Sequence, residues 1–329
     1  MSVLVSGGAG YIGSHMVLAL IDAGFDVIVL DDLSTGFDWL VHPEASFVRG
    51  DVADAALVRR VVREHEVDAV VHFAARIVVP ESVADPLGYY LANTAKSRSF
   101  LETLIALGVS NFIFSSTAAV YGMVGSDPVS EEAALAPISP YGRSKLMTEW
   151  MLFDAAVAHS LRYVALRYFN VAGADPAGRA GQSTRRATHL IKVAAEAALG
   201  KRAGIEIFGT DYPTPDGTCL RDYIHVTDLV AAHLDALRYL RAGGASRVLN
   251  CGYGWGYSVR EVVDTVKRVS GVDFPVRVAQ RRAGDPAAIV AGAHCIKRDL
   301  GWSPKLADLD LIVAHALSWE MRLGERNRI

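Results

Sequence analysis

The pattern of apolar and polar positions alternates between short buried runs and longer stretches with helical spacing. Val3, Leu4 and Val5 form an apolar run, and residues 11–23 follow with the apolar spacing of a helix. Strand-like runs and helical stretches then alternate along the chain: strands at 67–75, 110–116 and 162–170, and helices near 54–65, 86–107 and 141–159. This alternation predicts an α/β fold with a doubly wound parallel sheet of the Rossmann type.

The alternation loosens after residue 170. Loops that contain Gly and Arg, around 173–187 and 209–222, separate shorter strands and helices there. The sequence therefore predicts a Rossmann domain over residues 1–170 and a smaller C-terminal substrate lobe over residues 171–329, with later segments free to cross back to the first domain.

A glycine-rich segment joins the first strand to the first helix. Gly8, Gly10 and Gly13 form G-x-G-x-x-G, and Gly7, Gly10 and Gly13 also form G-x-x-G-x-x-G, so the spacing does not choose between variants of the dinucleotide fingerprint. Both variants supply a tight turn, a close backbone approach to a pyrophosphate, and helix amides aimed at its charge. An ordinary glycine-rich turn would fit these residues about as well if they stood alone.

The second strand, "VIVLDD", favours the dinucleotide interpretation. It ends in Asp31 and Asp32, and Asp31 lies eighteen residues after Gly13, near the position where a carboxylate accepts hydrogen bonds from the adenosine ribose. A carboxylate there repels a ribose phosphate, so we expect NAD rather than NADP. The residues expected to bind NAD in this region are Gly7, Gly10, Tyr11, Ile12, Gly13, Asp31 and Asp32.

A second group of chemically active residues lies further along the chain. Tyr141 and Lys145 are four residues apart on an expected helix, so both lie on one face. The preceding strand ends in Ser115, Ser116 and Thr117, at the edge where open α/β sheets bind ligands. A hydroxyl, a tyrosine and a lysine beside a nicotinamide are suited to coupled proton and hydride transfer.

Composition and charge exclude several other classes of protein. The 33 basic and 36 acidic residues give a net charge of −3, which offers no excess for nucleic acid or an anionic membrane. Cys219, Cys251 and Cys295 are too few and too widely spaced for a disulfide framework or a zinc cluster. No apolar stretch approaches the roughly 20 residues of a membrane span, and no secretory signal pattern opens the chain. We expect a cytoplasmic protein without a metal.

Several motifs together carry a resemblance to a known family. They are "GGAGYIGSH", "DDLSTG", "GDV", "HFAA", "ESV", "SSTAAVYG", "SPYGRSK", "LRYFNVAGA", "FGTDYPTPDGTCLRDYIHV", "RRAGD" and "LGW". With these motifs the chain resembles, essentially from end to end, the extended short-chain dehydrogenase/reductase family and, within it, the UDP-glucose 4-epimerases.

The resemblance implies an activity and the residues that carry it. It implies inversion at C4 of UDP-glucose or UDP-galactose through a transient 4-keto sugar, with tightly bound NAD and with Thr117, Tyr141 and Lys145 as catalytic residues. Lys145 and oxidised nicotinamide would lower the pKa of Tyr141 so that the phenolate acts as the base. The further NAD contacts that it implies, beside Tyr141 and Lys145, are Asp51, Val52, Phe73, Ala74, Ala75, Asn93 and Tyr168.

The resemblance also assigns residues to a UDP-sugar. Asn170, Arg221, Arg282 and Asp285 would hold the nucleotide. Thr117 would hydrogen-bond the 4-oxygen of the sugar, and Ile289 would flank its 2-substituent. His189 contacts the diphosphate or serves packing. Two departures from the family, Lys192 in place of a common proline and Ile77 in place of a lysine that contacts the cofactor, leave their own roles open.

Three alternative functions share this fold. Another UDP-sugar, such as UDP-N-acetylglucosamine or a UDP-pentose, fits the same scaffold. Nucleotide-sugar 4,6-dehydratases carry an acidic pair after the catalytic hydroxyl, whereas Ala118 and Ala119 follow Thr117 here. A non-catalytic NAD-binding module would have lost Tyr141 or Lys145. The family likeness also implies a homodimer through helices 86–107 and 141–159.

Overall fold

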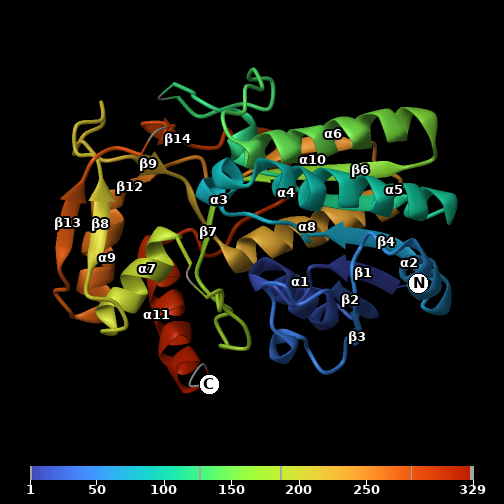
Figure 1. The fold of residues 1–329 in the computed structure, drawn as a ribbon, viewed down its shortest axis with the longest axis horizontal. Helices are drawn as coiled ribbons and strands as arrows, with labels where there is room; N and C mark the ends of the chain where they lie inside the picture. Colours follow the sequence, from blue (N-terminus) through green and yellow to red (C-terminus); the bar gives the residue numbers. More distant parts are fainter. Residues whose placement is uncertain (1, 126, 186, 283, 327–329) are drawn as a thin grey trace.

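The larger part of the molecule is built on a parallel sheet (Figure 1). The computed structural model describes residues 2–125, 127–185, 187–282 and 284–326. Within them, seven strands form one sheet in the order β11-β6-β5-β4-β1-β2-β3. Its strands are β1 (Ser2–Ser6), β2 (Val27–Asp31), β3 (Ser46–Arg49), β4 (Val67–His72), β5 (Asn111–Ser115), β6 (Arg162–Tyr168) and β11 (Arg247–Cys251). The expected doubly wound Rossmann-type α/β fold is confirmed.

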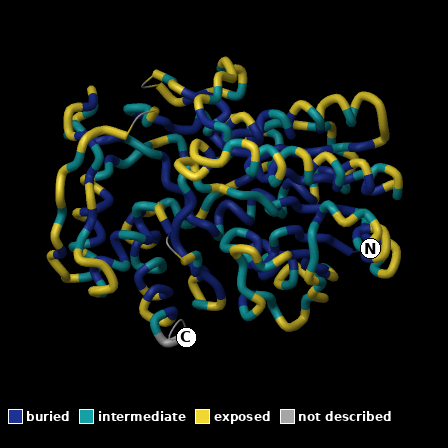
Figure 2. Tube along the Cα trace, in the orientation of Figure 1, coloured by how far each residue is buried: buried dark blue, intermediate teal, exposed yellow. Residues whose placement is uncertain are grey.

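Helices cover both faces of this sheet, which explains why its strands are apolar without alternation. Val3 and Val5 pack on one face and Leu4 on the other, so all three are fully buried. One face is covered by α1 (Tyr11–Asp22) and α8 (Val226–Arg241). The helices on the other face are α2 (Ala55–Glu64), α5 (Lys96–Ala106) and α6 (Pro140–Ala158). Figure 2 shows the buried strands between more exposed helices.

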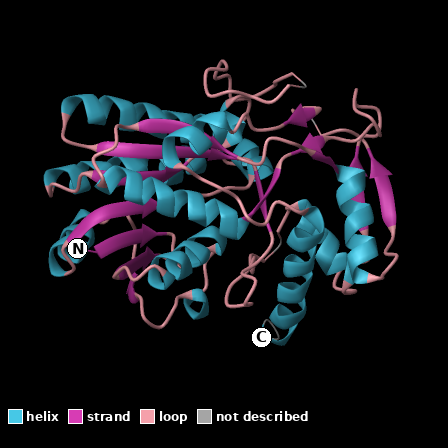
Figure 3. Cartoon of the chain, turned by 180° about the vertical axis from the view of Figure 1, so that it is seen from behind, coloured by secondary structure: helices cyan, strands magenta, loops and turns pink. Residues whose placement is uncertain are grey.

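The chain returns to this sheet after it has entered the second lobe. Strand β11 pairs in parallel with β6, and α8 packs beside α1. The domain boundary near residue 170 stays a prediction. We add that residues 226–251, which form α8 and β11, pack with the first domain. Where the chain returns to the first domain, α8 begins close to the junction of the two lobes (Figure 3).

The smaller lobe is made of short strands and three longer helices (Figure 1). Its helices are α7 (Leu190–Ala198), α9 (Val259–Ser270) and α11 (Leu309–Arg326), and α10 (His294–Leu300) lies against β11. Its strands form two- and three-stranded sheets: β7 (Asn170–Ala172) with β10 (Tyr223–His225), β8 (Ile205–Phe208) with β13 (Val276–Ala279), and β9 (Leu220–Arg221) between β12 (Tyr257–Ser258) and β14 (Ala288–Ile289).

One expected helix is divided in the structure. Residues 86–107 form α4 (Pro86–Tyr89), a π-helical segment η2 (Tyr90–Ala95) and α5 without a gap, preceded by α3 (Val79–Ala84). Short 3-10 turns η1 (Asp38–Leu40) and η3 (Ala118–Val120) follow β2 and β5. A π-helical turn often marks a functional site, and this one carries Asn93. Among the described helices, none is long and apolar enough to cross a membrane.

Candidate active site

The glycine-rich turn between β1 and α1 forms a backbone cradle. Gly7 has a positive φ of 74°, and a Cβ added there would lie 2.6 Å from the Ala74 nitrogen. A Cβ on Gly13 would lie 2.0 Å from the Gly7 carbonyl oxygen, so only glycine lets the helix approach the strand this closely. Gly10 caps α1 without a side-chain hydrogen bond, and the first turn of the helix holds no acidic residue. The free helix amides fit a pyrophosphate.

The carboxylate at the end of β2 lies beside this cradle. One oxygen of Asp31 accepts from the Ala9 amide at 2.9 Å and the other from the Leu33 amide at 2.8 Å. Each oxygen keeps a second lone pair for a ribose hydroxyl, so the expected role of Asp31 fits the geometry. Asp32 is exposed and accepts only from the Ser34 amide, at 2.8 Å.

The other expected NAD residues follow strands β3 and β4 or lie on neighbouring elements. Phe73 and Ala74 continue β4 and pass next to Gly7, with Ala75 after them. Asp51 is paired with Lys96, and Val52 is buried. Phe73, Ala74 and Ala75 lie at the carboxyl end of β4, beside β1, where the strand order reverses and where sheets of this type bind ligands. Asp51 and Val52 follow the edge strand β3.

Asn93 has a structural part in this region. Its side-chain oxygen accepts from the Arg76 amide at 2.8 Å, and its amide donates to the Arg76 carbonyl at 2.9 Å and to Ser144 Oγ at 3.0 Å. Asn93 therefore ties the segment after β4 to helix α6, and a contact with NAD stays a prediction. The Tyr168 hydroxyl is bonded to Ser115 Oγ, and its ring lies 6.1 Å from that of His233.

The expected catalytic residues come together at the end of β5. Ser139 starts α6 by accepting from the Gly142 amide at 3.1 Å, and Pro140 occupies the first turn. A Cβ on Gly142 would lie 2.6 Å from the Ala119 oxygen, so this glycine lets α6 approach the turn that carries Thr117. The Tyr141 hydroxyl is hydrogen-bonded to Thr117, and Lys145 Nζ donates to the Ser115 carbonyl at 2.8 Å.

Burial dominates the electrostatics of this cluster. Burial raises the pKa of the Tyr141 phenol, and the hydrogen bond with Thr117 lowers it in part. Burial lowers the pKa of Lys145 to about 7, and the charge of Glu149 acts in the opposite direction. The expected fall in the Tyr141 pKa stays a prediction for the NAD-bound enzyme, because two cations must offset the effect of burial.

A cavity of about 570 Å³ lies in the smaller lobe. This volume is within the range of small-molecule sites, roughly 300–1,000 Å³. It brings together five residues expected to bind the nucleotide: Asn170, His189, Arg221, Arg282 and Asp285. Thr117, Tyr141 and Lys145 are not among the described residues that line it.

The two expected arginines of this cavity are held in different ways. Arg221 donates to the carbonyls of Leu220 at 2.8 Å and Pro286 at 2.9 Å, and its Nη2 lies 3.6 Å from Asp285 Oδ1. Arg282 is exposed and places its guanidinium 3.7 Å from the centre of the Phe208 ring. Arg221 is therefore fixed before a ligand binds, whereas Arg282 is kept in place by stacking on an aromatic side chain.

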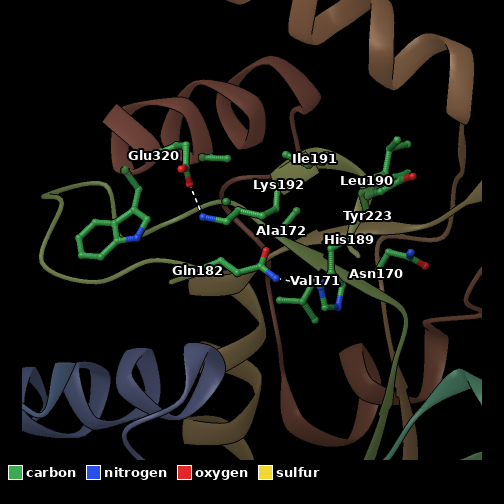
Figure 4. Close-up of a pocket in the computed structure, with 13 residues that line it drawn as sticks. Asn170, Val171, Ala172, Gln182, His189, Leu190, Ile191, Lys192, Tyr223 and Glu320 are labelled. Carbon is green, nitrogen blue, oxygen red and sulfur yellow. Dashed lines mark hydrogen bonds and ion pairs between the residues drawn. The ribbon is translucent and has the colours of Figure 1, made fainter. Parts of the chain in front are cut away.

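His189 lines both this cavity and a smaller one of about 20 Å³, whose lining residues are drawn in Figure 4. Burial lowers the pKa of His189, so the ring is neutral. The Gln182 amide lies 2.8 Å from Nδ1, and because an amide nitrogen only donates, Nδ1 accepts and the ring proton is on Nε2. A neutral ring with a free N–H donor is compatible with either of the two roles considered for His189.

Figure 4 shows the ion pair that Lys192 forms with Glu320. Its Nζ is paired with Glu320 of α11 and lies 3.7 Å from Glu196 in its own helix. The pair is almost fully buried, with 5% and 4% of the two side chains exposed. Lys192 therefore fixes α7 to α11 and does not line the larger cavity. Ile77 is about half exposed, and its effect on NAD affinity stays open.

Ile289 lies apart from the larger cavity and close to the catalytic turn. It is buried in a small apolar cluster with Ala118 and Leu146, the residues that follow Thr117 and Lys145. In the sheet it is the register partner of Arg221. Ile289 is therefore next to neighbours of Thr117 and Lys145 on one side and to Arg221 of the larger cavity on the other. Its contact with the 2-substituent of the sugar stays a prediction.

Sequence analysis missed several residues that line the larger cavity. They are mostly apolar or basic: Leu190, Arg202, Phe208, Tyr223 and Arg277. Arg277 alternates with Val276 and Val278 on β13, so strand periodicity was the signal that could have placed its side chain. Within the described part of the chain, no group of His, Cys, Asp and Glu side chains has a metal-binding arrangement.

Comparisons with known proteins agree with this geometry. Residues 3–252 match the NAD dependent epimerase/dehydratase family. A UDP-glucose 4-epimerase of Azospirillum brasilense is 59% identical over 323 residues, which cover 98% of this chain and 93% of the relative. A crystal structure of UDP-glucose 4-epimerase from Brucella ovis in complex with NAD has a TM-score of 0.94 and 45% identity, and covers 96% of this chain and 97% of its own.

A third relative is the UDP-Glc/GlcNAc 4-epimerase from Campylobacter jejuni. Its structure has a TM-score of 0.86 and 48% identity, covering 98% of this chain and 99% of its own. The likeness in sequence and in structure extends over both lobes. The chain therefore belongs to the NAD dependent epimerase/dehydratase family.

Proposed function

We propose that this protein is an NAD-dependent UDP-glucose 4-epimerase, which interconverts UDP-glucose and UDP-galactose. The observation that carries the proposal is the meeting of Thr117, Tyr141 and Lys145 at the carboxyl end of β5, in the same sheet as the glycine cradle. The relatives from Azospirillum brasilense and Brucella ovis, both named UDP-glucose 4-epimerase, support the choice of sugar.

The chain's own residues divide the work at C4. When bound, NAD supplies a reversible acceptor for the hydrogen on C4. Tyr141 takes the proton of the 4-hydroxyl group as the general base, and Thr117 hydrogen-bonds the same oxygen. Lys145, held by the Ser115 carbonyl, stabilises negative charge on Tyr141 while its amine is protonated. Inversion would follow when the keto sugar takes the hydride back on the opposite face of C4 while Tyr141 returns the proton to the 4-oxygen.

The cavity of the smaller lobe would hold the UDP group. Arg221 is placed to bind the diphosphate, because a guanidinium presents paired N–H donors to phosphate oxygens. Asp285 would accept from the ribose hydroxyls, and Arg282 and Asn170 would complete the contacts. The Campylobacter jejuni relative, named for both UDP-Glc and GlcNAc, supports a second substrate with an acetamido group. Ala118 and Ala119, which follow Thr117, supply no acid for dehydration.

The function is tested with UDP-galactose and the purified enzyme, without added NAD. We expect UDP-glucose to appear in the NMR spectrum. Denatured enzyme should release NAD and not NADP, because each turnover regenerates NAD and the cofactor need not dissociate. An enzyme that is folded and NAD-loaded but converts neither UDP-hexose nor UDP-pentose would contradict the proposal.

A homodimer and a cytoplasmic location complete the proposal. Large apolar side chains are exposed on two adjoining helical regions, and the dimer would bury them: Leu87, Leu91, Trp150, Phe153 and Val157. We expect a dimer by light scattering and a monomer for Trp150→Glu with Phe153→Glu, whereas Met321→Glu, at an exposed site on α11, leaves the mass unchanged. A wild-type monomer at micromolar concentration would contradict it. Three free thiols support a reducing compartment.

A further inference from the structure

Helix α6 is hydrogen-bonded to two consecutive residues at the end of β5, Ser115 and Ser116. Lys145 Nζ donates to the Ser115 carbonyl at 2.8 Å, and the Ser116 hydroxyl donates to the carboxylate of Glu149. Lys145 and Glu149 are four residues apart, so they lie one turn apart on the same face of the helix. The next residue of the chain is Thr117. These two contacts therefore set the position of the Thr117 hydroxyl relative to the helix that carries Tyr141.

Glu149 is held in a buried ion pair as well. Arg167 of β6 donates from Nε to Oε1 at 3.0 Å and from Nη2 to Oε2 at 2.6 Å, and each side chain is 4% exposed. Burying two charges removes them from water at a cost in free energy, and apolar side chains of similar volume often stabilise a fold as well or better. Packing alone therefore does not account for a charged pair at this place.

The pair is part of a network that ends in the substrate lobe. Arg167 Nη1 donates to the Tyr121 hydroxyl at 3.0 Å, which donates to Asn250 Oδ1 at 2.6 Å. Asn250 Nδ2 in turn donates to the Val129 carbonyl at 2.8 Å, and the Val129 amide donates to Val290 at 2.8 Å. Val290 follows Ile289. A continuous set of hydrogen bonds therefore links Glu149 on α6 to Val290, the residue after Ile289, beside the proposed sugar site.

The surroundings of Lys145 include one carboxylate. From β4, His72 is neutral, because burial and then the charge of Lys145 lower its pKa to about 3. From β5, the Phe114 ring centre lies 5.0 Å from Nζ. Tyr168 of β6 is an un-ionised phenol whose pKa burial raises. Tyr141 and Glu149 face Lys145 from its own helix, and Glu149 carries the negative charge that favours the ammonium form.

We propose that Glu149 is a positioning residue for the reaction: its carboxylate holds the strand end that presents Thr117 and keeps a proton on Lys145, so that negative charge can develop on Tyr141. The inference rests on the proposed function, since it assigns Tyr141 the role of base. It extends that function by one residue, which acts through Ser116 and Lys145 and does not touch the substrate.

The test uses a charge-neutral double variant, Glu149→Gln with Arg167→Met, because Glu149→Gln alone leaves Arg167 buried without a partner. Glu149→Asp is the conservative variant, which keeps the charge but shortens the reach to Ser116. Lys192→Met with Glu320→Gln is the matched control, since it removes another ion pair of similar burial. The readouts are the pH profile of kcat and an NMR titration of isotope-labelled lysine, with Lys145 assigned from Lys145→Met.

The double variant removes both charges of the ion pair, but of the two it is the Glu149 carboxylate that raises the pKa of Lys145, so the Lys145 proton becomes easier to remove. In the double variant we expect the pH profile of kcat to move to lower pH by about one unit. The plateau of kcat should fall about tenfold, because the active form, with Lys145 protonated and Tyr141 ionised, is populated less often. The Lys145 pKa measured by NMR falls with it. Glu149→Asp keeps the position of the profile but lowers the plateau, and the control pair keeps the wild-type profile.

The inference is overturned if the double variant is folded and keeps both the wild-type profile and the wild-type Lys145 titration. A shift of similar size in the control pair would also overturn it, because the effect would then belong to any buried ion pair. Failure of the proposed function is a separate outcome. A wild-type enzyme that epimerises no UDP-sugar would sink the function, while the NMR titration would still measure whether Glu149 holds the proton on Lys145.

Discussion

The catalytic cluster and the nucleotide cavity are built in opposite ways. Thr117, Tyr141 and Lys145 are buried at the end of a central strand and on a long helix, and buried hydrogen bonds fix them. The nucleotide cavity is lined by loops, short strands and the first turns of α7 and α9, and Arg282 on its wall is exposed. The comparison indicates that the reaction at C4 is set by the fold, whereas the choice of sugar is open to small changes in the wall.

The largest effect is expected at the centre of the catalytic cluster. Tyr141→Phe removes only the ionisable oxygen, so we expect kcat to fall by about 10²–10⁴-fold while the purified protein still carries NAD. Tyr239→Phe on α8, outside the site, is the control and keeps wild-type kcat. Steady-state kinetics with UDP-galactose measure the change. Wild-type kcat in Tyr141→Phe would show that another group is the base.

A smaller effect, confined to binding, is expected in the cavity. Arg221→Ala removes charged hydrogen bonds that each contribute about 1.5–3 kcal/mol, so KM should rise about 10- to 100-fold with little change in kcat. Arg221→Lys should restore little, because an ammonium cannot bind two oxygens in the same fork. Arg98→Ala removes an exposed helix ion pair and serves as the control. A fall in kcat at unchanged KM would place Arg221 in the chemistry instead.

The smallest effect is expected where the two regions meet. Ile289→Tyr adds a ring next to Ala118 and Leu146, so it should lower kcat/KM for UDP-N-acetylglucosamine about tenfold more than for UDP-glucose. Ile289→Val, which removes one methyl group, should leave the ratio of the two substrates close to that of the wild type. Parallel assays with both sugars measure this ratio. Equal losses on both sugars, or no acetamido turnover in the wild type, would refute this role of Ile289.

The fold and the meeting of Thr117, Tyr141 and Lys145 were predictable from local sequence patterns. Strands buried on both faces are apolar throughout, as Val3, Leu4 and Val5 are. Tyr141 and Lys145 are four residues apart, so they lie on one face of α6 even if the predicted ends of the helix are wrong by a few residues. The return of β11 to the sheet was not predictable from local pattern, because pairing with β6 depends on residues about eighty positions apart.

The cavity was predictable only in part. Arg221 and Asp285 stand in recognisable motifs, but Arg202, Phe208 and Arg277 reach the same cavity from separate elements whose packing the sequence does not state. The ion pair of Glu149 with Arg167 was missed for the same reason: the two residues are eighteen positions apart, and only the contact of α6 with β6 brings them together.

The central claim is that Tyr141 removes the proton on the 4-oxygen and never one on carbon. The most direct measurement is the conversion of UDP-galactose in deuterated water, with the product examined by NMR. The account predicts UDP-glucose that keeps its original hydrogen on C4, because that hydrogen never exchanges with solvent. Deuterium on C4 of the product would contradict the account, since it would require a solvent-exchangeable proton to have been taken from carbon.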